Sequence, residues 1–509
     1  MSSLEFLDWR TAESVDNLVA LFEERAKRHP ERLFIADKLL RMTWGDMAAA
    51  LRGFAAEHGE RLRDKDVAVF MSNGSDLLTT YLSVLFCGGR AALFNAAMPR
   101  ASGAKLMADL KPEMVFADHA LEFEPDAILV DAPMIEGWIA AKAEGENRSG
   151  SGEDPATYFY SGGTTGIPKR ILYTHAQITA AGSRMQWGWP LCEGEVFLPI
   201  APFSHIYGYL AGVCLPIQCG GGSIVPDGFH PAAALDLIEN EKVTVLGGGP
   251  PAIYQAMMAD PKLDQRDLSS LRVCPGGGAA FPVEVHKRWK ELTGLTIYEG
   301  YGMTEMAPIS VNTAEAGNRP GSVGKSVPDS AFEVVDIDTG TRKMPTGEAG
   351  EIRIQGPHMM RGYCENPEET ALVLRDGWVY TGDIGVIDEE GFLTITDRKK
   401  DVILHKGFNV FPREVEEALH SHPSITGVSV VGVPDVRAGE VVVAYVTVKP
   451  GENPSAEDLR AACAEYLVSY KMPGRIEFLE KLPLTPAGKV DRLALRAKAK
   501  EAADASALV

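Results

Sequence analysis

The sequence predicts an α/β protein that ends in a smaller α+β unit, and two observations lead to this fold class. Up to Gly302, short hydrophobic strand patterns alternate with amphipathic helix patterns, which is typical of a largely parallel sheet covered by helices. Past Asp401, a helix (412–420), two hydrophobic strands (427–433 and 441–448) and a second helix (455–467) follow one another. They make a unit of about a hundred residues, near the lower end of ordinary domain size.

The first elements of the chain follow the α/β pattern. Residues 17–29 carry Leu18, Leu21 and Phe22 at helical spacing, and the following proline ends the helix. A buried strand is predicted at 67–71, a helix at 76–87 and the next strand at 90–94.

The region from Ser223 to Gly302 is the most regular part of the chain. Its strands are predicted at 223–225, 243–246, 271–274 and 296–298, separated by helices that begin near Pro231, Pro250 and Pro282. Proline suits a first helical turn.

Three of these strands run directly into glycine: 247–249, 276–278 and Gly300. Ligands bind beyond the carboxyl ends of parallel strands, so these glycines indicate a crevice that a ligand enters. Tight turns alone would explain any one triplet, but less easily all three. Beyond Ser322, short strands (331–336 and 351–355) indicate an antiparallel subdomain.

Composition limits the partners and the compartment. The 509 residues are 45% apolar and carry a formal charge of −20, which argues against nucleic acid or an anionic membrane as a partner. The seven cysteines include no Cys-x-x-Cys pair and are expected to be reduced core residues. No export signal is visible, and the most apolar stretch (77–98) is broken by Gly88-Gly89-Arg90. We therefore expect a cytoplasmic protein without membrane insertion.

The stretch Ser161-Gly-Gly-Thr-Thr-Gly-Ile-Pro-Lys169 has the composition of a phosphate-binding loop. Within nine positions it holds three glycines, three hydroxyl residues and one lysine. Glycines let backbone N–H groups approach phosphate oxygens, hydroxyls donate further hydrogen bonds, and lysine adds a point charge. An ordinary flexible loop is the alternative, although such a loop needs neither Pro168 nor the aromatic approach at 158–160. The Walker pattern does not fit, because Lys169 follows proline and precedes arginine.

Four further stretches carry a family resemblance that covers nearly the whole chain. Together with the loop at 161–169, they resemble in order and spacing the core motifs of adenylate-forming enzymes (the ANL superfamily), of the acyl- or aryl-CoA ligase type: Tyr298-Glu-Gly-Tyr-Gly-Met-Thr-Glu305, Tyr380-Thr-Gly-Asp383, Asp397-Arg-Lys-Lys-Asp401 and Pro486-Ala-Gly-Lys489. The resemblance implies a large N-terminal AMP-binding domain of three subdomains (1–399). It also implies a small mobile C-terminal domain (400–509) that carries the catalytic lysine.

The activity implied by this resemblance is an acid–thiol ligase reaction with ATP, Mg²⁺ and coenzyme A. A carboxylate attacks the α-phosphate of Mg-ATP to give an acyl-adenylate, and coenzyme A then displaces AMP. Catalysis of the first step is mostly placement and charge neutralisation, since an anion approaches a polyanion. The alternative is a stand-alone adenylation enzyme that loads an amino acid or another acid onto a carrier protein. A non-enzymatic nucleotide-binding scaffold is a third hypothesis.

The resemblance also implies roles for individual residues. The catalytic residues would be Lys489, Thr304, Glu305 and His205, with Glu305 also the metal ligand. Lys400 would be the hinge and Gly407 would line the pantetheine tunnel. The acyl pocket would contain Phe203, His205, Gly277, Gly300 and Met306. The residues implied to bind nucleotide or coenzyme A are Ser161, Gly162, Gly163, Thr164, Thr165, Gly166, Lys169, Gly278, Ala279, Glu299, Gly300, Tyr301, Gly302, Asp383, Arg398, Lys400 and Gly407.

Taken without the resemblance, several of these residues have plainer interpretations. A glutamate after Thr304 would begin a helix, Asp383 would be a turn residue, and Lys489 would be one solvated lysine among many. In the acyl pocket that the resemblance implies, Glu299 stands where an arginine is expected if a second carboxylate, as in malonate, were bound. We therefore predict a monocarboxylic substrate, aromatic or short- to medium-chain aliphatic. The partners are then this acid, ATP and coenzyme A, and a homodimer stays open.

Overall fold

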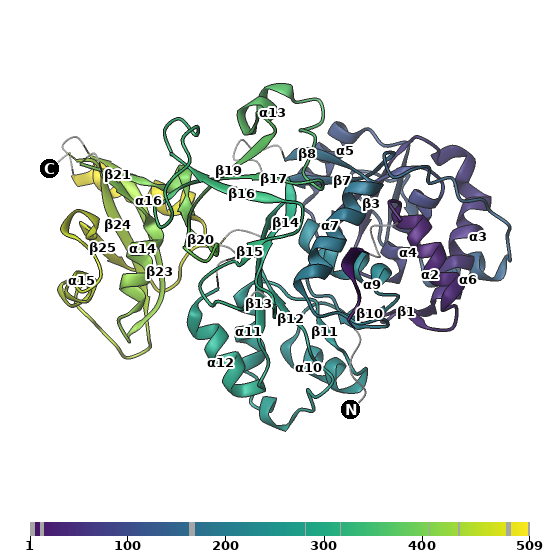
Figure 1. Cartoon of the computed structure of the whole chain (residues 1–509), viewed down its shortest axis with the longest axis horizontal. Helices are drawn as coiled ribbons and strands as arrows, with labels where there is room; N and C mark the ends of the chain where they lie inside the picture. Colours follow the sequence, from purple (N-terminus) through teal and green to yellow (C-terminus); the bar gives the residue numbers. More distant parts are fainter. Residues whose placement is uncertain are drawn as a thin grey trace. The chain divides into compact units, whose positions relative to one another are not determined.

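The computed structural model divides into two compact parts, which are described separately. Unit 1 comprises Met1–Phe332, Ile354–Tyr380 and Gly391–Leu393, and unit 2 comprises Glu333–Arg353, Thr381–Glu390 and Thr394–Val509. Figure 1 draws the chain with its elements labelled. The structure describes residues 6–10, 15–161, 168–279, 281–315, 317–406, 408–435, 438–484 and 490–506, with side chains up to residue 499.

The first sheet of unit 1 is the one that leads into the phosphate loop. Its strand order is β6-β5-β3-β4-β7-β8, parallel throughout except for the antiparallel pair β7 and β8. Its strands β3 and β4 are almost wholly apolar and buried, as expected where helices cover both faces of a sheet. The bounds are β3 Asp66–Met71, β4 Arg90–Asn95, β5 Met114–Ala117, β6 Ile128–Leu129, β7 Pro155–Ser161 and β8 Lys169–Thr174.

The second sheet of unit 1 has the order β11-β9-β10-β1-β2, with only β1 and β2 antiparallel. The third has the order β12-β13-β14-β15, with β12 and β13 parallel and the rest antiparallel. Parallel bridges continue the second sheet into the third. The bounds are β1 Leu33–Ala36, β2 Arg41–Thr43, β9 Val196–Leu198, β10 Gly222–Ile224, β11 Val245–Leu246, β12 Cys274–Gly276, β13 Ile297–Met303, β14 Met306–Val311 and β15 Lys325–Ser326.

The helices of unit 1 begin where the sequence provides start signals. The Asn17 side chain accepts hydrogen bonds from the first turn of α2, and Thr43 with Asp46 forms a capping box on α3. A π-helical segment (Leu210–Cys214) separates α8 from α9. The bounds are α2 Leu18–Arg28, α3 Trp44–Leu62, α4 Ser75–Phe86, α5 Arg100–Leu110, α6 Ala132–Ala140, α7 His175–Gly188, α8 Ile206–Tyr209, α9 Leu215–Gln218, α10 Pro231–Asn240, α11 Pro251–Met258, α12 Val283–Thr293 and α13 Pro367–Val373.

One hydrophobic core fixes the strand ends that line the candidate site. Tyr254 and Trp289 are fully buried, with ring centroids 5.0 Å apart in an edge-to-face arrangement, and they pack with Leu246 and Ile297. Each such side chain contributes about 2–3 kcal/mol of hydrophobic stabilisation. The Tyr254 hydroxyl donates to the Pro275 carbonyl oxygen at 2.5 Å, which holds β12 beside α11.

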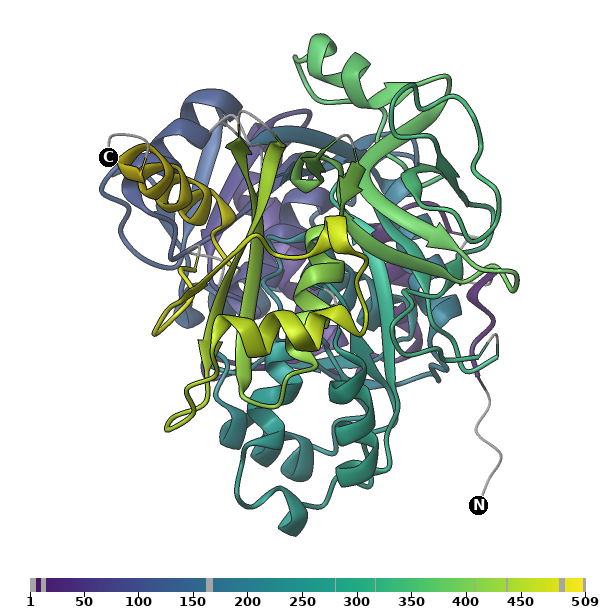
Figure 2. The same ribbon diagram turned by 90° about the vertical axis from the view of Figure 1, so that its left-hand side faces the viewer.

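The boundary between the units runs through a further sheet of order β16-β17-β19-β18, with β20 paired to β19. Unit 2 has its own sheet of order β22-β21-β24-β23, with β25 paired to β24. Figure 2 shows the long strands β23 and β24 with their helices. The bounds are β16 Ala331–Val335, β17 Gly350–Gln355, β18 Leu374–Arg375, β19 Trp378–Ile387, β20 Leu393–Arg398, β21 Ile403–His405, β22 Phe408–Val410, β23 Ile425–Asp435, β24 Gly439–Val448, β25 Arg475–Phe478, α14 Pro412–His420, α15 Ala456–Ala464 and α16 Arg492–Ser506.

Comparison with the sequence predictions confirms the architecture and corrects two strand ends. The α/β alternation, the short-strand region and the α+β unit are confirmed. Gly276 and Gly300, however, do not follow their strands. Gly276 lies inside β12, where it pairs with Glu299, and Gly300 lies inside β13, where its backbone pairs with Val311 of β14. Across the described part of the chain, no helix combines the length and apolar character that crossing a membrane requires.

Candidate active site

The Tyr301–Glu305 stretch forms the end of a β-hairpin. Strands β13 and β14 are antiparallel, and the chain turns between them at Thr304 and Glu305. The register shifts between Tyr301 and Met303, a bulge of the kind that redirects side chains near functional sites. The plainer interpretation of Glu305, a helix start, is therefore wrong.

Glu305 is a nearly buried carboxylate. It is 6% exposed, and its Oε1 accepts a hydrogen bond from the Tyr363 hydroxyl at 2.7 Å. The adjacent Thr304 carbonyl oxygen accepts one from the Tyr173 hydroxyl at 2.8 Å. No cationic side chain in the described ranges forms an ion pair with Glu305. Because buried charges in proteins are normally paired or bound to a metal, these oxygens suit a hard cation such as Mg²⁺.

The ends of the predicted phosphate loop lie near Tyr363, the residue that contacts this carboxylate. Ser161 ends β7 and lies opposite Lys169, which begins β8; the residues between them that were predicted to bind phosphate, Gly162, Gly163, Thr164, Thr165 and Gly166, lie outside the described residues. Lys169 Nζ is 2.6 Å from Glu369 Oε2 and 4.8 Å from the ring centroid of Tyr363. Burial, followed by the charge of Glu305, raises the pKa of Tyr363, so the phenol is a hydrogen-bond donor. Tyr363 thus joins Lys169 and Glu305 in one cluster.

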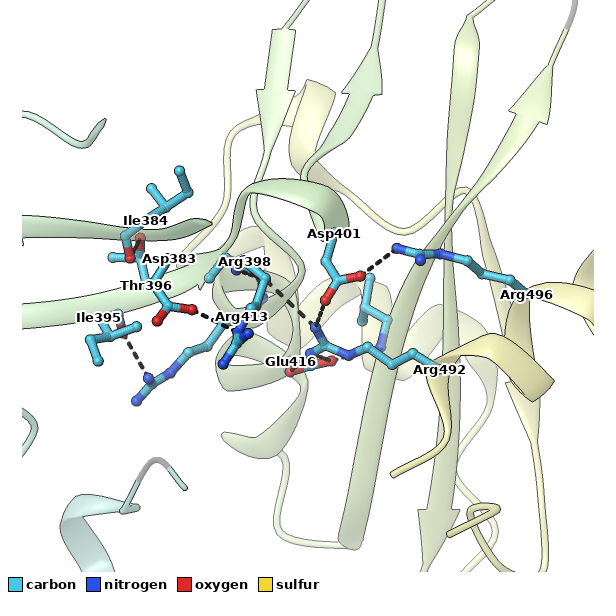
Figure 3. A network of polar contacts seen from close by, with 12 residues as sticks. Asp383, Ile384, Ile395, Thr396, Arg398, Asp401, Arg413, Glu416, Arg492 and Arg496 are labelled. Carbon is cyan, nitrogen blue, oxygen red and sulfur yellow. Dashed lines mark hydrogen bonds and ion pairs between the residues drawn. The ribbon is translucent and has the colours of Figure 1, made fainter. Parts of the chain in front are cut away.

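The predicted ribose acid lies in unit 2 and is already paired. Asp383 is 3% exposed, and its Oδ1 is 2.6 Å from Arg398 Nε; Figure 3 shows this pair. The Thr381 hydroxyl donates to the Ile352 carbonyl oxygen and accepts from the Asp383 N–H, which fixes the turn. Lys400 is exposed in a 3-10 turn of residues Lys399–Asp401.

The proposed acyl-wall residues Phe203, His205 and Met306 differ in exposure. The Phe203 ring is fully buried, and a Cβ on Gly212 would collide with it. His205 is exposed, and its Nδ1 accepts from the Tyr207 N–H at 3.3 Å at the start of α8. Met306 is fully buried. Phe203 and Met306 are therefore buried behind the predicted acyl-pocket wall in this structure, whereas His205 is accessible from solvent.

Gly277 is buried and packs closely against Gly300 and Tyr207. A Cβ on Gly277 would lie 3.1 Å from the Gly300 carbonyl oxygen and 3.6 Å from Cε2 of Tyr207, so this close approach favours glycine at the position. The Tyr207 hydroxyl has no hydrogen-bond partner among the described residues. The neighbouring residues predicted to face adenine, Gly278 and Ala279, are exposed.

Glu299, in contrast, is engaged inside the protein. It is 3% exposed, its Oε2 is 3.2 Å from His286 Nε2, and its Oε1 accepts from the Phe281 N–H at 3.3 Å. The structure therefore engages this carboxylate with His286 and the Phe281 N–H inside the protein. Of the remaining predicted residues, Tyr301 is partly buried and Gly302 is exposed, and Gly407 and Lys489 lie outside the described residues.

Three residues of the site were missed by sequence reasoning: Tyr363, Tyr207 and Asn73. Asn73 accepts from the Phe203 N–H at 2.8 Å and donates to the Ala201 carbonyl oxygen at 2.9 Å, which clamps the loop before α8. Tyr207 could have been found from its place two residues after His205. Tyr363 and Asn73 are far from any predicted motif and carry no comparable signal.

Comparison with known proteins identifies the class of this site. A family model described as AMP-binding enzyme matches residues 22–364, and one described as AMP-binding enzyme C-terminal domain matches residues 414–489. The chain belongs to this family of adenylate-forming enzymes. The predicted family and fold class are thereby confirmed.

Individual relatives are CoA ligases by name. The chain is 43% identical over 342 residues to a long-chain-fatty-acid–CoA ligase of Bacillus subtilis, covering 67% of this chain and 61%, less than two thirds, of that relative. It is 35% identical over 430 residues to a feruloyl-CoA synthase of an Amycolatopsis species, covering 81% of this chain and 84% of the relative.

Solved structures show the same architecture over nearly the full chain. ATP-bound MatB from Rhodopseudomonas palustris aligns with a TM-score of 0.86 and 26% identity, covering 95% of this chain and 99% of that one. The anthranilate CoA ligase AuaEII in complex with anthranoyl-AMP aligns with a TM-score of 0.85 and 26% identity, covering 96% and 98%.

Proposed function

We propose that this chain is an AMP-forming ligase that activates a monocarboxylic acid with Mg-ATP and transfers the acyl group to coenzyme A. The observation that carries the proposal is the nearly buried carboxylate of Glu305, which has one hydrogen bond from Tyr363 and no cationic partner among the described residues. Lys169 lies against the same tyrosine. The names of the relatives support a CoA ligase over a scaffold protein.

In the first step, a carboxylate oxygen of the acid attacks the α-phosphorus of ATP, and the bond to the bridging oxygen of the β-phosphate breaks. Lys169 would hold the departing pyrophosphate, exchanging Glu369 for phosphate oxygens. Glu305 would hold the magnesium ion, which when bound supplies charge that neutralises the phosphate oxygens. Thr304 would hydrogen-bond the α-phosphate, and Lys489 would place its charge beside the reacting oxygens.

Nucleotide and acyl group would be oriented by the remaining residues. Tyr301 would stack on adenine beside Gly278, while Asp383 and Arg398 would bind the ribose hydroxyls. In the second step the thiol sulfur attacks the acyl carbon, AMP leaves, and the thiol proton is released. Gly407 would line the route of the pantetheine arm once the C-terminal domain, taken from Lys400 onward, has rotated.

The position before Gly300 supports an acid with a single carboxylate. Glu299 stands there and is engaged with His286, so this position provides no cation for a second carboxylate. The Tyr207 hydroxyl, which has no hydrogen-bond partner among the described residues, can hydrogen-bond a polar group on the acid. We therefore favour a monocarboxylate, aromatic or short- to medium-chain aliphatic, over a dicarboxylate. The proposal also includes a cytoplasmic location and a homodimeric state. Sedimentation tests the oligomeric state.

The proposal is tested by a panel of carboxylic acids incubated with Mg-ATP, each with and without coenzyme A. We expect pyrophosphate release that depends on one class of acid, with AMP and the acyl-CoA thioester as products. Release without a thioester would contradict the ligase assignment and favour transfer to a carrier protein. No release with aromatic, aliphatic or amino acids would contradict adenylation itself.

A further inference from the structure

Residues 485–489 (the lysine loop of the predicted motif) lie outside the described residues, and the residues of unit 2 that flank them are called the base of the loop. Leu484 and Val490, which flank it directly, form an antiparallel bridge. The Asp491 N–H donates to the Pro483 carbonyl oxygen at 2.8 Å, and α16 begins at the next residue, Arg492. The first helical residue is thus only three positions from Lys489 in the sequence.

Arg492 is held by three carboxylates from three different elements. Its Nη2 is 2.8 Å from Oε1 and 3.1 Å from Oε2 of Glu416 on α14. Its Nη1 is 3.3 Å from Asp401 Oδ2 and 3.5 Å from Asp397 Oδ1. Figure 3 shows the guanidinium reaching from α16 to Asp401 and Glu416. A planar guanidinium can hold several carboxylates at fixed angles, which a lysine ammonium cannot.

The carboxylates that hold Arg492 are mostly buried. The side chains of Asp397, Asp401 and Glu416 are 2%, 9% and 16% exposed. Burial raises the pKa of Asp397 and of Glu416, and the nearby charge of Arg492 opposes this shift. Without Arg492, the ion pair from Arg496 to Asp401 would be the one left to these three acids among the described residues. The arrangement therefore has a strong preference for one position of the start of α16.

Two of these acids belong to the segment predicted to be the hinge. Asp397 and Asp401 bracket Arg398, Lys399 and Lys400, and Arg398 pairs with the ribose acid Asp383 at 2.6 Å. One five-residue segment therefore contacts both the proposed ribose site and the base of the lysine loop. A displacement of this segment would carry Arg492 with it.

We propose that Arg492 is a positioning residue for Lys489, fixing the base of the lysine loop to the segment Asp397–Asp401 so that both adopt one arrangement during adenylation. This proposal rests on the proposed function and deepens it. Arg492 contacts no reacting atom in the proposed mechanism. The effect is confined to the first half-reaction, because only that step uses Lys489.

Arg496 provides a matched control. It lies one turn further along α16, and its Nη2 is 2.7 Å from Asp401 Oδ1. It shares the network and the charge of Arg492, but it contacts neither Glu416 nor Asp397 in the described contacts. Arg496→Gln therefore removes a similar ion pair while leaving the base of the loop held.

The test compares Arg492→Gln, Arg492→Lys, Arg496→Gln and Lys489→Ala in the full-length protein. Each is assayed for pyrophosphate release in a single turnover with ATP and the acid, and separately for thioester formation from supplied acyl-adenylate and coenzyme A. For Arg492→Gln we expect a fall of about ten- to a hundredfold in the first rate at saturating substrates, and a second rate within about twofold of wild type. Arg492→Lys should recover part of the loss. Arg496→Gln should leave both rates within about twofold, whatever its loss of thermal stability.

Equal losses in both half-reactions, or the same loss for Arg496→Gln as for Arg492→Gln, would overturn the proposal. If Arg492→Gln does not fold, Arg492→Lys decides, since it keeps a charge beside Glu416: a first half-reaction unchanged from wild type would contradict the positioning role. Failure of the proposed function is recognised separately. In that case wild-type protein itself makes no adenylate, or Lys489→Ala retains the first half-reaction.

Discussion

Glu305 of unit 1 and the acid cluster of unit 2 are all mostly buried carboxylates, but their partners differ. In unit 2, Asp397, Asp401 and Glu416 are all within ion-pair distance of Arg492. In unit 1, Glu305 has a tyrosine hydroxyl and no cationic side chain in the part of the chain that the structure describes. A buried acid that is fully paired contributes to fold and rigidity, whereas one without a cation retains lone pairs for a ligand. This contrast separates the structural acids from the one proposed to bind metal.

The largest expected effect is that of Glu305→Gln. Adenylation should fall about a hundred- to a thousandfold, as for loss of a major electrostatic contact in the transition state. The free energy of unfolding should fall by no more than about 0.5 kcal/mol, since no ion pair is lost. Pyrophosphate release and urea unfolding measure the two quantities. A large loss of stability with activity retained would place Glu305 among the structural acids.

Asp76 sharpens the comparison, because it too is buried without a cationic side chain bonded to it among the described residues. It is 4% exposed, and burial, with smaller contributions from Asp118 and Asp37, raises its pKa to about 6. The folded protein then binds this proton more tightly than the unfolded chain. Its contribution to stability is therefore complete below a pH of about 4 and is lost as the pH rises to about 6.

The test is Asp76→Asn, followed by unfolding at several pH values. The variant should be more stable than wild type at pH 7 by at most about 3 kcal/mol, and the difference should vanish near pH 4. A pH-independent difference would show that Asp76 does not titrate in this range. Asp76 would then need a cation or ligand, and would join Glu305 in the comparison.

Glu416→Gln should lower stability more than adenylation, the reverse of what is expected for Glu305→Gln. The change removes the charge that accepts two hydrogen bonds from Arg492 and one from the Val430 N–H. The free energy of unfolding should fall by about 2–3 kcal/mol. It is measured from the urea concentration at the unfolding midpoint, with the dependence of the free energy on urea unchanged. Unchanged stability would mean that the network of unit 2 contributes little, and the contrast between the units would fail.

Tyr363→Phe should give the smallest effect. It removes one hydrogen bond to Glu305 and keeps the ring beneath Lys169. The loss of about 1 kcal/mol should raise the Mg²⁺ concentration needed for half-maximal adenylation about fivefold. An unchanged Mg²⁺ requirement would separate the tyrosine from the metal site.

The sequence predicted the strands and helices where pattern and local chemistry agree. Helix α2 ends at Arg28 before a proline, and β3 and β4 are continuous apolar runs. It misplaced the end of β13 because Gly300 looks like a turn residue, and only pairing with Val311, a contact absent from local sequence, keeps it extended.

Prediction of the site was limited in the same way. Motif residues such as Glu305, Lys169 and Asp383 could be named in advance, because their spacing matches a family pattern. Tyr363 and Asn73 could not, since each acts through a contact with a residue more than fifty positions away. Nor could the sequence show that Glu299 is engaged with His286. Long-range hydrogen bonds decide these roles, and no local pattern encodes them.

The account depends most directly on the claim that Glu305 holds the metal of the nucleotide. Titration of Mn²⁺ in the presence of ATP, followed by electron paramagnetic resonance, measures this without any turnover. We predict that wild-type protein binds the Mn²⁺–ATP complex and that Glu305→Gln, still folded, binds it about tenfold more weakly, a loss of about 1.4 kcal/mol. Equal affinity of the two proteins would contradict the central claim.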